Sequence, residues 1–110
     1  MVGESLKQID LFLDSLWVES GLSENTLAAY GSDLKIFSKW LTNKTVFDVE
    51  QSDIAAFMAS RYKLGIGSRS AARFLSSLRR FYGFLHREGL LAVDPTELIE
   101  APRIGRTLPE

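Results

Sequence analysis

Apolar residues recur at intervals of three and four positions in successive segments of this 110-residue chain, which places them on one face of an α-helix. No segment alternates apolar and polar residues in the manner of a half-buried strand. We therefore predict an all-α fold, a small bundle of four main helices with a short fifth helix. The first helix should run from Ile9 to near Gly21, and the second should follow an N-cap at Ser23. Their predicted buried stripes are Ile9, Phe12, Leu13, Leu16 and Trp17, and Leu27, Tyr30, Leu34, Phe37 and Leu41.

A polar break at residues 42–45 separates these helices from two further helical segments. Ser52 is a suitable cap for the third helix, and the glycines within residues 65–67 should end it. The fourth helix should open at Ser68 and end at Gly89. The predicted buried residues are Ile54, Phe57, Met58 and Tyr62 in the third helix, and Phe74, Leu75, Leu78, Phe81, Tyr82 and Leu85 in the fourth.

The short fifth helix is predicted to follow Asp94. Asp94 can act as its N-cap, Pro95 suits the first helical position, and Glu97 lies three residues after the cap. Residues 102–110 lack periodicity, so we interpret them as a linker stub toward a further domain that this sequence does not contain. Residues 1–101 then form one domain, a size that can bury a single core.

The composition argues against several kinds of chemistry. The chain has no cysteine, and no uncharged apolar run reaches the roughly 18 residues of a membrane span. The first residues also lack a secretory signal, so we expect a cytoplasmic protein that contacts no membrane. His86 is the only histidine, and the acidic residues, which we expect to face the solvent, show no paired or metal-binding spacing. We predict no catalytic residue, metal, cofactor or small-molecule substrate.

Basic residues are distributed unevenly, although the net charge is only −1. Residues 1–60 carry nine acidic side chains and four basic ones, whereas residues 61–87 contain no Asp or Glu. This concentration is typical of a nucleic-acid surface, but also of a solvated helix face whose arginines pair with acids elsewhere. The basic residues of the span are Arg61, Lys63, Arg69, Arg73, Arg79, Arg80 and Arg87.

The predicted fourth helix places most of these cations opposite its apolar stripe, because an α-helix advances 3.6 residues per turn. Arginine matches phosphate oxygens or the edge of guanine, serine permits close approach, and a helix fits the major groove. We interpret this face as a DNA surface, with a solvated or protein-binding face as the alternative. We assign the aromatic residues, Trp17 and Trp40 included, to the core rather than to base stacking. The face contains Arg69, Arg73, Ser76, Ser77, Arg80 and Arg87.

Several stretches, in order along nearly the whole chain, resemble the XerD-type tyrosine site-specific recombinases of the tyrosine recombinase and phage integrase family. Leu16-Trp17 together with Asn25-Thr26 favours the XerD branch over its XerC sister. The stretches are IDLFLDSLW at residues 9–17, LSENTLAAY at 22–30, Asp33-Leu34, SAARFLSSLRRFY at 70–82, Asp94-Pro95 and Ala101-Pro102-Arg103.

The resemblance implies a SAM-like core-binding domain whose two crossing helices lie near the major groove, and the second and fourth predicted helices match them. It also implies a separate C-terminal domain that cuts DNA through a covalent bond to a tyrosine, without metal or nucleotide. Tyr30, Tyr62 and Tyr82 lie on apolar stripes, so none is expected to be that nucleophile, and this part alone is expected to be no enzyme. One departure is Gly31-Ser32, where many relatives carry basic residues.

For the full-length protein, the resemblance implies the conversion of chromosome dimers to monomers before cell division, with a XerC-like recombinase and a septal DNA translocase as partners. A phage or mobile-element integrase is the alternative within the family. A helical protein-interaction module without DNA binding is the alternative from another class. We expect Arg73 and Arg80 to be the principal anchors on double-stranded DNA, and Arg73 to contribute little to stability. The predicted DNA-binding residues are Asn25, Thr26, Arg69, Ser70, Arg73, Ser76, Ser77 and Arg80.

Overall fold

The computed structural model describes residues 2–99, except for the side chain of Val2, and within this range the fold is all-α, as predicted. No described helix is long and apolar enough to cross a membrane. The predicted boundary after residue 101 and the predicted linker, residues 102–110, lie outside the described residues. The elements are α1 (Val2–Ser20), α2 (Glu24–Leu41), the single 3-10 turn η1 (Val46–Asp48), α3 (Gln51–Lys63) and α4 (Ser68–Arg87).

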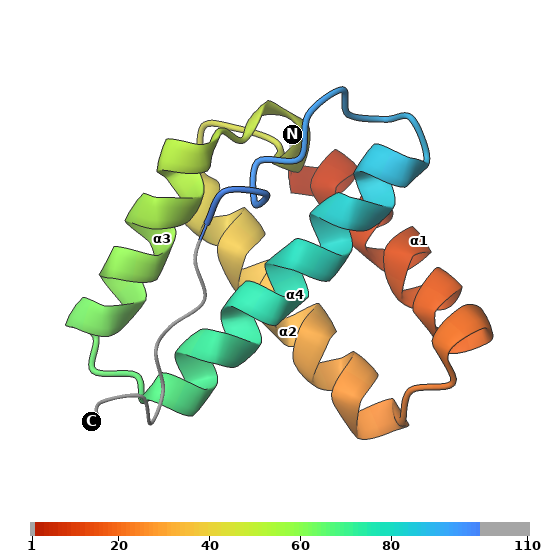
Figure 1. Cartoon of the computed structure of the whole chain (residues 1–110), viewed down its shortest axis with the longest axis horizontal. Helices are drawn as coiled ribbons and strands as arrows, with labels where there is room; N and C mark the ends of the chain where they lie inside the picture. The colour runs from red at the N-terminus through yellow and green to blue at the C-terminus, as the bar shows by residue number, and fades with distance from the viewer. Residues whose placement is uncertain (1, 100–110) are drawn as a thin grey trace.

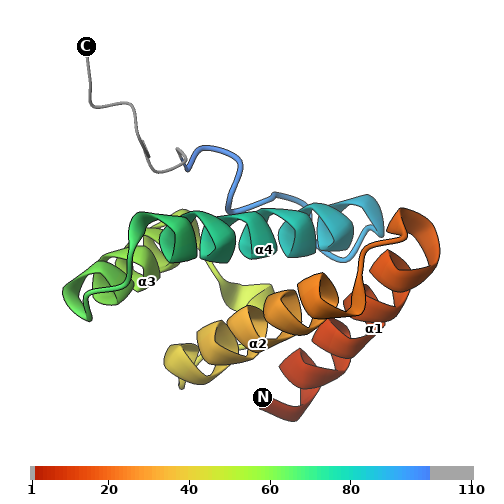
Figure 2. The same cartoon turned by 90° about the horizontal axis from the view of Figure 1, so that it is seen from below.

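Helix α4 crosses the other helices on one side of the molecule (Figure 1). It passes in front of α2, with α3 beside its first half and α1 beside its second half. The view turned by 90° shows α1 and α2 together in a layer beneath α4 (Figure 2). One side of α4 therefore faces the core, and the other remains available as a surface.

Aromatic side chains join α4 to each of the other helices. Phe81 meets Phe12 of α1 with ring centroids 5.4 Å apart, and Phe74 meets a phenylalanine of α3 at 5.5 Å. Tyr82 lies 6.4 Å from Phe37 of α2. The predicted buried stripe of α4 is confirmed throughout, because Phe74, Leu75, Leu78, Phe81, Tyr82 and Leu85 are all buried.

Two aromatic residues assigned to the core are instead exposed. Trp17 is 53% exposed and Tyr62 is 48% exposed. Both lie in the last turn of their helices, α1 and α3, where the neighbouring helices no longer cover the stripe. Trp40, by contrast, is partly buried and packs against the rings of Phe37 and Phe57 at 6.4 and 5.4 Å. In α1 the packing reaches Leu16, so Trp17 lies at the edge of the buried stripe, whereas in α3 the buried residues end at Met58, one turn before Tyr62.

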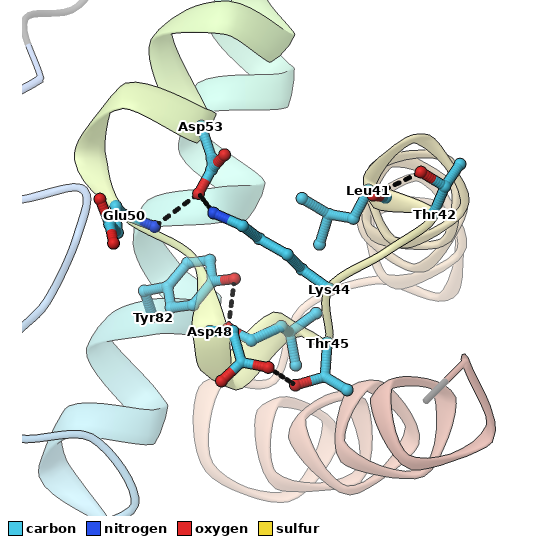
Figure 3. A network of polar contacts seen from close by, with 9 residues as sticks. Leu41, Thr42, Lys44, Thr45, Asp48, Glu50, Asp53 and Tyr82 are labelled. Carbon is cyan, nitrogen blue, oxygen red and sulfur yellow. Dashed lines mark hydrogen bonds and ion pairs between the residues drawn. The ribbon is translucent and has the colours of Figure 1, made fainter.

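The helix starts agree with the prediction at α2 and α4 but not at α1 and α3, and α1 begins at Val2, seven positions before the predicted Ile9. Ser23 caps α2, as its Oγ accepts the backbone N–H of Thr26 at 3.2 Å. The N-cap of α3 is Glu50 and not the predicted Ser52. Asp53 decides this start, because its Oδ2 accepts the backbone N–H of Glu50 at 2.9 Å and the ammonium of Lys44 at 2.7 Å (Figure 3). The hydrogen bond to Lys44 lowers the pKa of the Asp53 carboxyl.

The 3-10 turn η1, which was not predicted, is anchored in the core by its first residue. Val46 at its start is fully buried, and side chains from two distant elements satisfy its backbone. Its N–H donates to Ser5 Oγ of α1 at 3.1 Å, and its carbonyl accepts the hydroxyl of Tyr82 at 2.8 Å. Figure 3 shows the Tyr82 ring pointing from α4 toward this turn. These two hydrogen bonds fix the connection between α2 and α3 to the core.

The predicted fifth helix is wrong, because residues 95–98 form turns. Asp94 Oδ1 accepts both the backbone N–H and the hydroxyl of Thr96, at 2.8 and 2.7 Å. The next backbone bonds, from Glu97 to Asp94 and from Ile99 to Thr96, each span three residues. Asp94 thus makes an N-cap contact, but the chain continues in turns, and Arg79 of α4 holds the segment by donating to the carbonyl of Ile99.

We predict that Tyr82→Phe lowers the free energy of unfolding by about 1–3 kcal/mol, because the buried carbonyl of Val46 would lose its donor. Chemical denaturation measures this loss. Tyr62→Phe is the matched control, since this hydroxyl belongs to a half-exposed side chain, and we expect a change below about 0.5 kcal/mol. Equal losses in the two variants would contradict the role given to the Tyr82 hydroxyl.

Candidate nucleic-acid interface

The outward side of α4 presents a row of cations. Arg69, Ser76, Arg80 and Arg87 are exposed and separated by seven, four and seven positions, so they follow one another along the same face of the helix. Within residues 2–99, none of these arginines forms an ion pair. We call these four residues the outer row of α4. An arginine without a carboxylate partner retains its full charge for an anionic ligand.

The side chain of Arg80 is exposed, and it also contacts α2. Its guanidinium carbon lies 5.9 Å from the centroid of the Tyr30 ring. A hollow of about 110 Å³ between α1 and α4 is lined by Arg80 and Arg87 together with Ser15 and Glu19. The ring contact orients the long side chain of Arg80 at the place where α2 and α4 cross.

Arg73 pairs with a buried carboxylate. Its Nε and Nη2 donate to the two carboxylate oxygens of Asp33 in α2, each at 2.8 Å. The Asp33 side chain is 1% exposed, whereas the Arg73 side chain is 47% exposed. The hydrogen bond to Asp33 raises the pKa of Arg73 above its ordinary value. The pair leads us to expect the opposite of the sequence-based prediction that Arg73 contributes little to stability, because its loss would leave a buried charge unpaired.

Ser77 does not lie on the surface. It is fully buried, and its Oγ lies 3.1 Å from Asp33 Oδ2 and 3.0 Å from the backbone carbonyl of Arg73. A buried hydroxyl cannot reach DNA while the fold is intact, so we withdraw Ser77 from the predicted contacts. It belongs instead to a network with Asp33 and Arg73, which we call the crossing network.

The sequence pattern held a signal for this network that we did not use. We expected the acidic residues to face the solvent, but Asp33 lies beside Leu34 on the buried side of α2. It is three and four positions from Tyr30 and Phe37, at a register that the helical period assigns to the edge of the core. A charged residue at such a position requires a partner, and Arg73 is that partner.

The remaining predicted residues lie at helix starts. Asn25 is exposed and Thr26 half-buried in the first turn of α2, where Thr26 Oγ accepts the hydroxyl of Ser23 at 3.0 Å. Ser70 is half-buried in the first turn of α4. Among the described residues no hydrogen bond links Asn25 or Thr26 to the arginines of α4. Contact of Asn25, Thr26 and Ser70 with DNA remains a prediction.

Not every basic residue of the span faces outward with the outer row. Arg79 donates to Ile99, and Arg61 lies over the ring of Phe57 with its guanidinium carbon 5.2 Å from the centroid. Both stabilise the protein's own packing. Fewer cations are therefore available to one ligand than the basic residues of positions 61–87 would suggest.

Gly31 has a structural reason for being a glycine. A Cβ at this position would approach Leu13 Cδ1 of α1 to 2.9 Å, closer than such contacts occur. Because Cδ1 is the end of a flexible side chain, Leu13 would have to shift to admit a side chain at this position. Gly31 and Ser32 are the two positions where many relatives carry basic residues. Of these, Gly31 is buried at the contact with α1, whereas Ser32 is exposed.

Tyr82 and His86 each contact a backbone carbonyl of the described residues. Burial raises the pKa of the Tyr82 hydroxyl well above its ordinary value, so this group remains a protonated donor to Val46. His86 is exposed, and its Nδ1 lies 3.1 Å from the carbonyl of Leu91. Over residues 2–99, no group of three or more His, Cys, Asp or Glu side chains could hold a metal ion.

Residues 9–89 match the family described as "Phage integrase, N-terminal SAM-like domain". The chain belongs to this family. It is also 45% identical over 104 residues to the tyrosine recombinase XerD of Proteus mirabilis, 46% to that of Pseudomonas putida and 44% to that of Shewanella oneidensis. Each alignment covers 93% of this chain, but only 33%, 35% and 35% of the respective relative. The chain thus spans about a third of the length of these recombinases.

We predict that Arg73→Ala lowers the free energy of unfolding by about 1.5–3 kcal/mol, the range for hydrogen bonds to charged groups. A fully buried pair would lose more, but the Arg73 side chain is 47% exposed and water screens part of its charge. Arg69→Ala is the control on the same helix, with an expected change within about 0.5 kcal/mol. Urea denaturation of both variants checks this, and equal stabilities would contradict the role of the pair.

Proposed function

We propose that this domain binds double-stranded DNA as the core-binding part of a tyrosine site-specific recombinase. The observation that carries the proposal is the outer row of α4, three arginines without ion pairs among the described residues, on the helix that crosses α2. Membership of the integrase SAM-like family and the likeness to XerD recombinases support the same conclusion.

The chemistry of the outer row suits a duplex. Arg69, Arg80 and Arg87 follow one helix face, and a helix with its side chains fits the width of the major groove. Their guanidinium groups match phosphate oxygens, which contribute most of the sequence-independent affinity. Ser76, with its short side chain between the arginines, allows the helix backbone to approach the DNA closely.

At the level of the whole protein, we propose site-specific recombination, with cleavage and rejoining by a tyrosine in another domain. The relatives carry the name tyrosine recombinase XerD, which favours chromosome dimer resolution in the cytoplasm with a XerC-like partner and a septal DNA translocase. A phage or mobile-element integrase would use a domain of the same family.

One observation favours protein interaction as a second candidate function. An apolar groove of about 500 Å³ between α1 and α2 is lined by Leu13, Leu27 and Ile36, with Lys35 and Lys39 at its rim. It adjoins a smaller hollow beside the exposed Trp17. Since this groove lies on α1 and α2 rather than on the outer row, partner binding there and DNA binding by α4 are separate properties.

We predict that the affinity for a random-sequence duplex falls steeply with salt. Each arginine that neutralises a phosphate should steepen the slope of log affinity against log salt by about 0.9, so the three arginines of the outer row, Arg69, Arg80 and Arg87, together predict about −2.7. Arg69→Ala and Arg80→Ala should each flatten the slope by about 0.9. Fluorescence anisotropy across a salt series measures the slopes.

Lys7→Ala is the control, because it removes an exposed cation from α1 and leaves α4 unchanged. We expect its slope to equal that of the original protein. If the two arginine variants bind like the original protein at every salt concentration, the outer row is not the DNA surface. The protein-interaction function would then be favoured.

A further inference from the structure

Arg73 uses only one edge of its guanidinium on Asp33. Nε and Nη2 donate to the carboxylate, each at 2.8 Å. A guanidinium carries five N–H donors in a fixed plane, so both hydrogens of Nη1 and the second hydrogen of Nη2 point elsewhere. No hydrogen bond within residues 2–99 uses Nη1, and the side chain is 47% exposed. The pair thus connects a buried anchor to an exposed donor edge.

The anchor itself is fixed from two helices. Asp33 belongs to α2 and lies beside Leu34, which is 1% exposed in the core. Ser77 of α4 adds a hydroxyl 3.1 Å from Asp33 Oδ2. Because the carboxylate cannot move without disturbing the core, it restricts the rotamers of the otherwise flexible Arg73. A side chain held in this way loses less conformational entropy when it binds a ligand.

The neighbouring arginines differ from Arg73 in charge and in freedom. Arg69 and Arg80 have no carboxylate partner among the described residues, so their full charge is available to a phosphate, and Arg80 is oriented only by its contact with the Tyr30 ring. The charge of Arg73 is largely balanced by Asp33, which makes it a poor counterion for phosphate. Its outer edge still presents two parallel N–H groups in a fixed plane. Such a pair matches the N7 and O6 acceptors of guanine in the major groove.

We propose that Asp33 is a positioning residue that holds Arg73 for base recognition, so that the outer guanidinium edge meets a guanine while Arg69 and Arg80 bind the backbone. This division of labour rests on the proposed function, DNA binding by α4. It changes the expectation from the sequence, in which Arg73 and Arg80 were equivalent anchors. Asp33 would not contact DNA and would act only through Arg73.

The test compares sequence preference with plain affinity in the 110-residue chain. A pool of randomised duplexes is first selected on the original protein, and the affinities for the enriched duplex and for a scrambled one of equal composition are then measured. Asp33→Asn keeps the side-chain volume at position 33 and leaves Arg73 charged. It removes the carboxylate that accepts two hydrogen bonds from Arg73. We expect the preference for the enriched duplex to fall about 5- to 100-fold, the equivalent of one bidentate base contact. The affinity for the scrambled duplex should not fall, and its salt slope should steepen by no more than about 0.9, because Asp33→Asn removes the carboxylate that balances the charge of Arg73.

Two further variants separate positioning from stability. The double variant Asp33→Asn/Arg73→Gln replaces the ion pair by two neutral amides that can hydrogen-bond to each other, so it should recover stability but not the sequence preference. Ile54→Val shortens a fully buried side chain of α3 without touching the crossing network, and it should destabilise the fold while the preference remains. All binding is measured at a temperature where circular dichroism shows each variant to be folded.

Three outcomes would overturn the positioning role. Folded Asp33→Asn with an undiminished preference would show that Arg73 reads no base through Asp33. Loss of scrambled-duplex affinity in the same variant would make Asp33 a support of the whole surface. Salt-dependent duplex binding without any enriched sequence would leave the proposed function standing and remove the base contact. If the original protein binds no duplex even at low salt, the proposed function fails as well.

Discussion

The packing of the apolar stripe of α4 is the interaction on which the rest of the structure depends. Each of the other helices is contacted by a different aromatic residue of this stripe. Phe81 meets α1, Tyr82 meets α2 and Phe74 meets α3. Tyr82 also fixes η1 through its hydroxyl. The same packing determines which side of α4 faces outward, so the core of the protein and the position of its arginines follow from a single helix.

Apolar packing alone would not define how α2 and α4 cross. Contacts between aliphatic and aromatic side chains are weakly directional, and several nearby arrangements bury a similar area. The crossing network adds a directional constraint, because a shift of α4 by one turn would separate Asp33 from Arg73. A buried carboxylate without a partner costs several kcal/mol, which penalises such alternatives. The two helices are therefore held in one relative position.

Much of the fold could be predicted because its signals are local. Ser23 at the start of α2 and the glycines after α3 and α4 act through hydrogen bonds and backbone angles within a few residues, with φ of 85° at Gly65 and 77° at Gly89. Two errors arose where a partner from another segment intervened. At the start of α3, Lys44 bonds to Asp53, and η1 depends on Ser5 and Tyr82. The turns after Asp94 combine the local bonds of Thr96 to Asp94 with the distant donor Arg79 on Ile99.

The sequence by itself determined the fold class, the buried face of α4 and the arginines on its opposite side. These properties follow from the helical period, which relates residues three and four positions apart. Only the tertiary structure decided the separate roles of the polar residues on that helix. Arg73 became the partner of Asp33, Ser77 became buried and Arg79 became attached to Ile99, whereas Arg69 and Arg80 stayed without a carboxylate partner in the described residues. The physical reason is that the partners of Arg73 and Ser77 lie on another helix, 40 and 44 positions away, where the helical period carries no information.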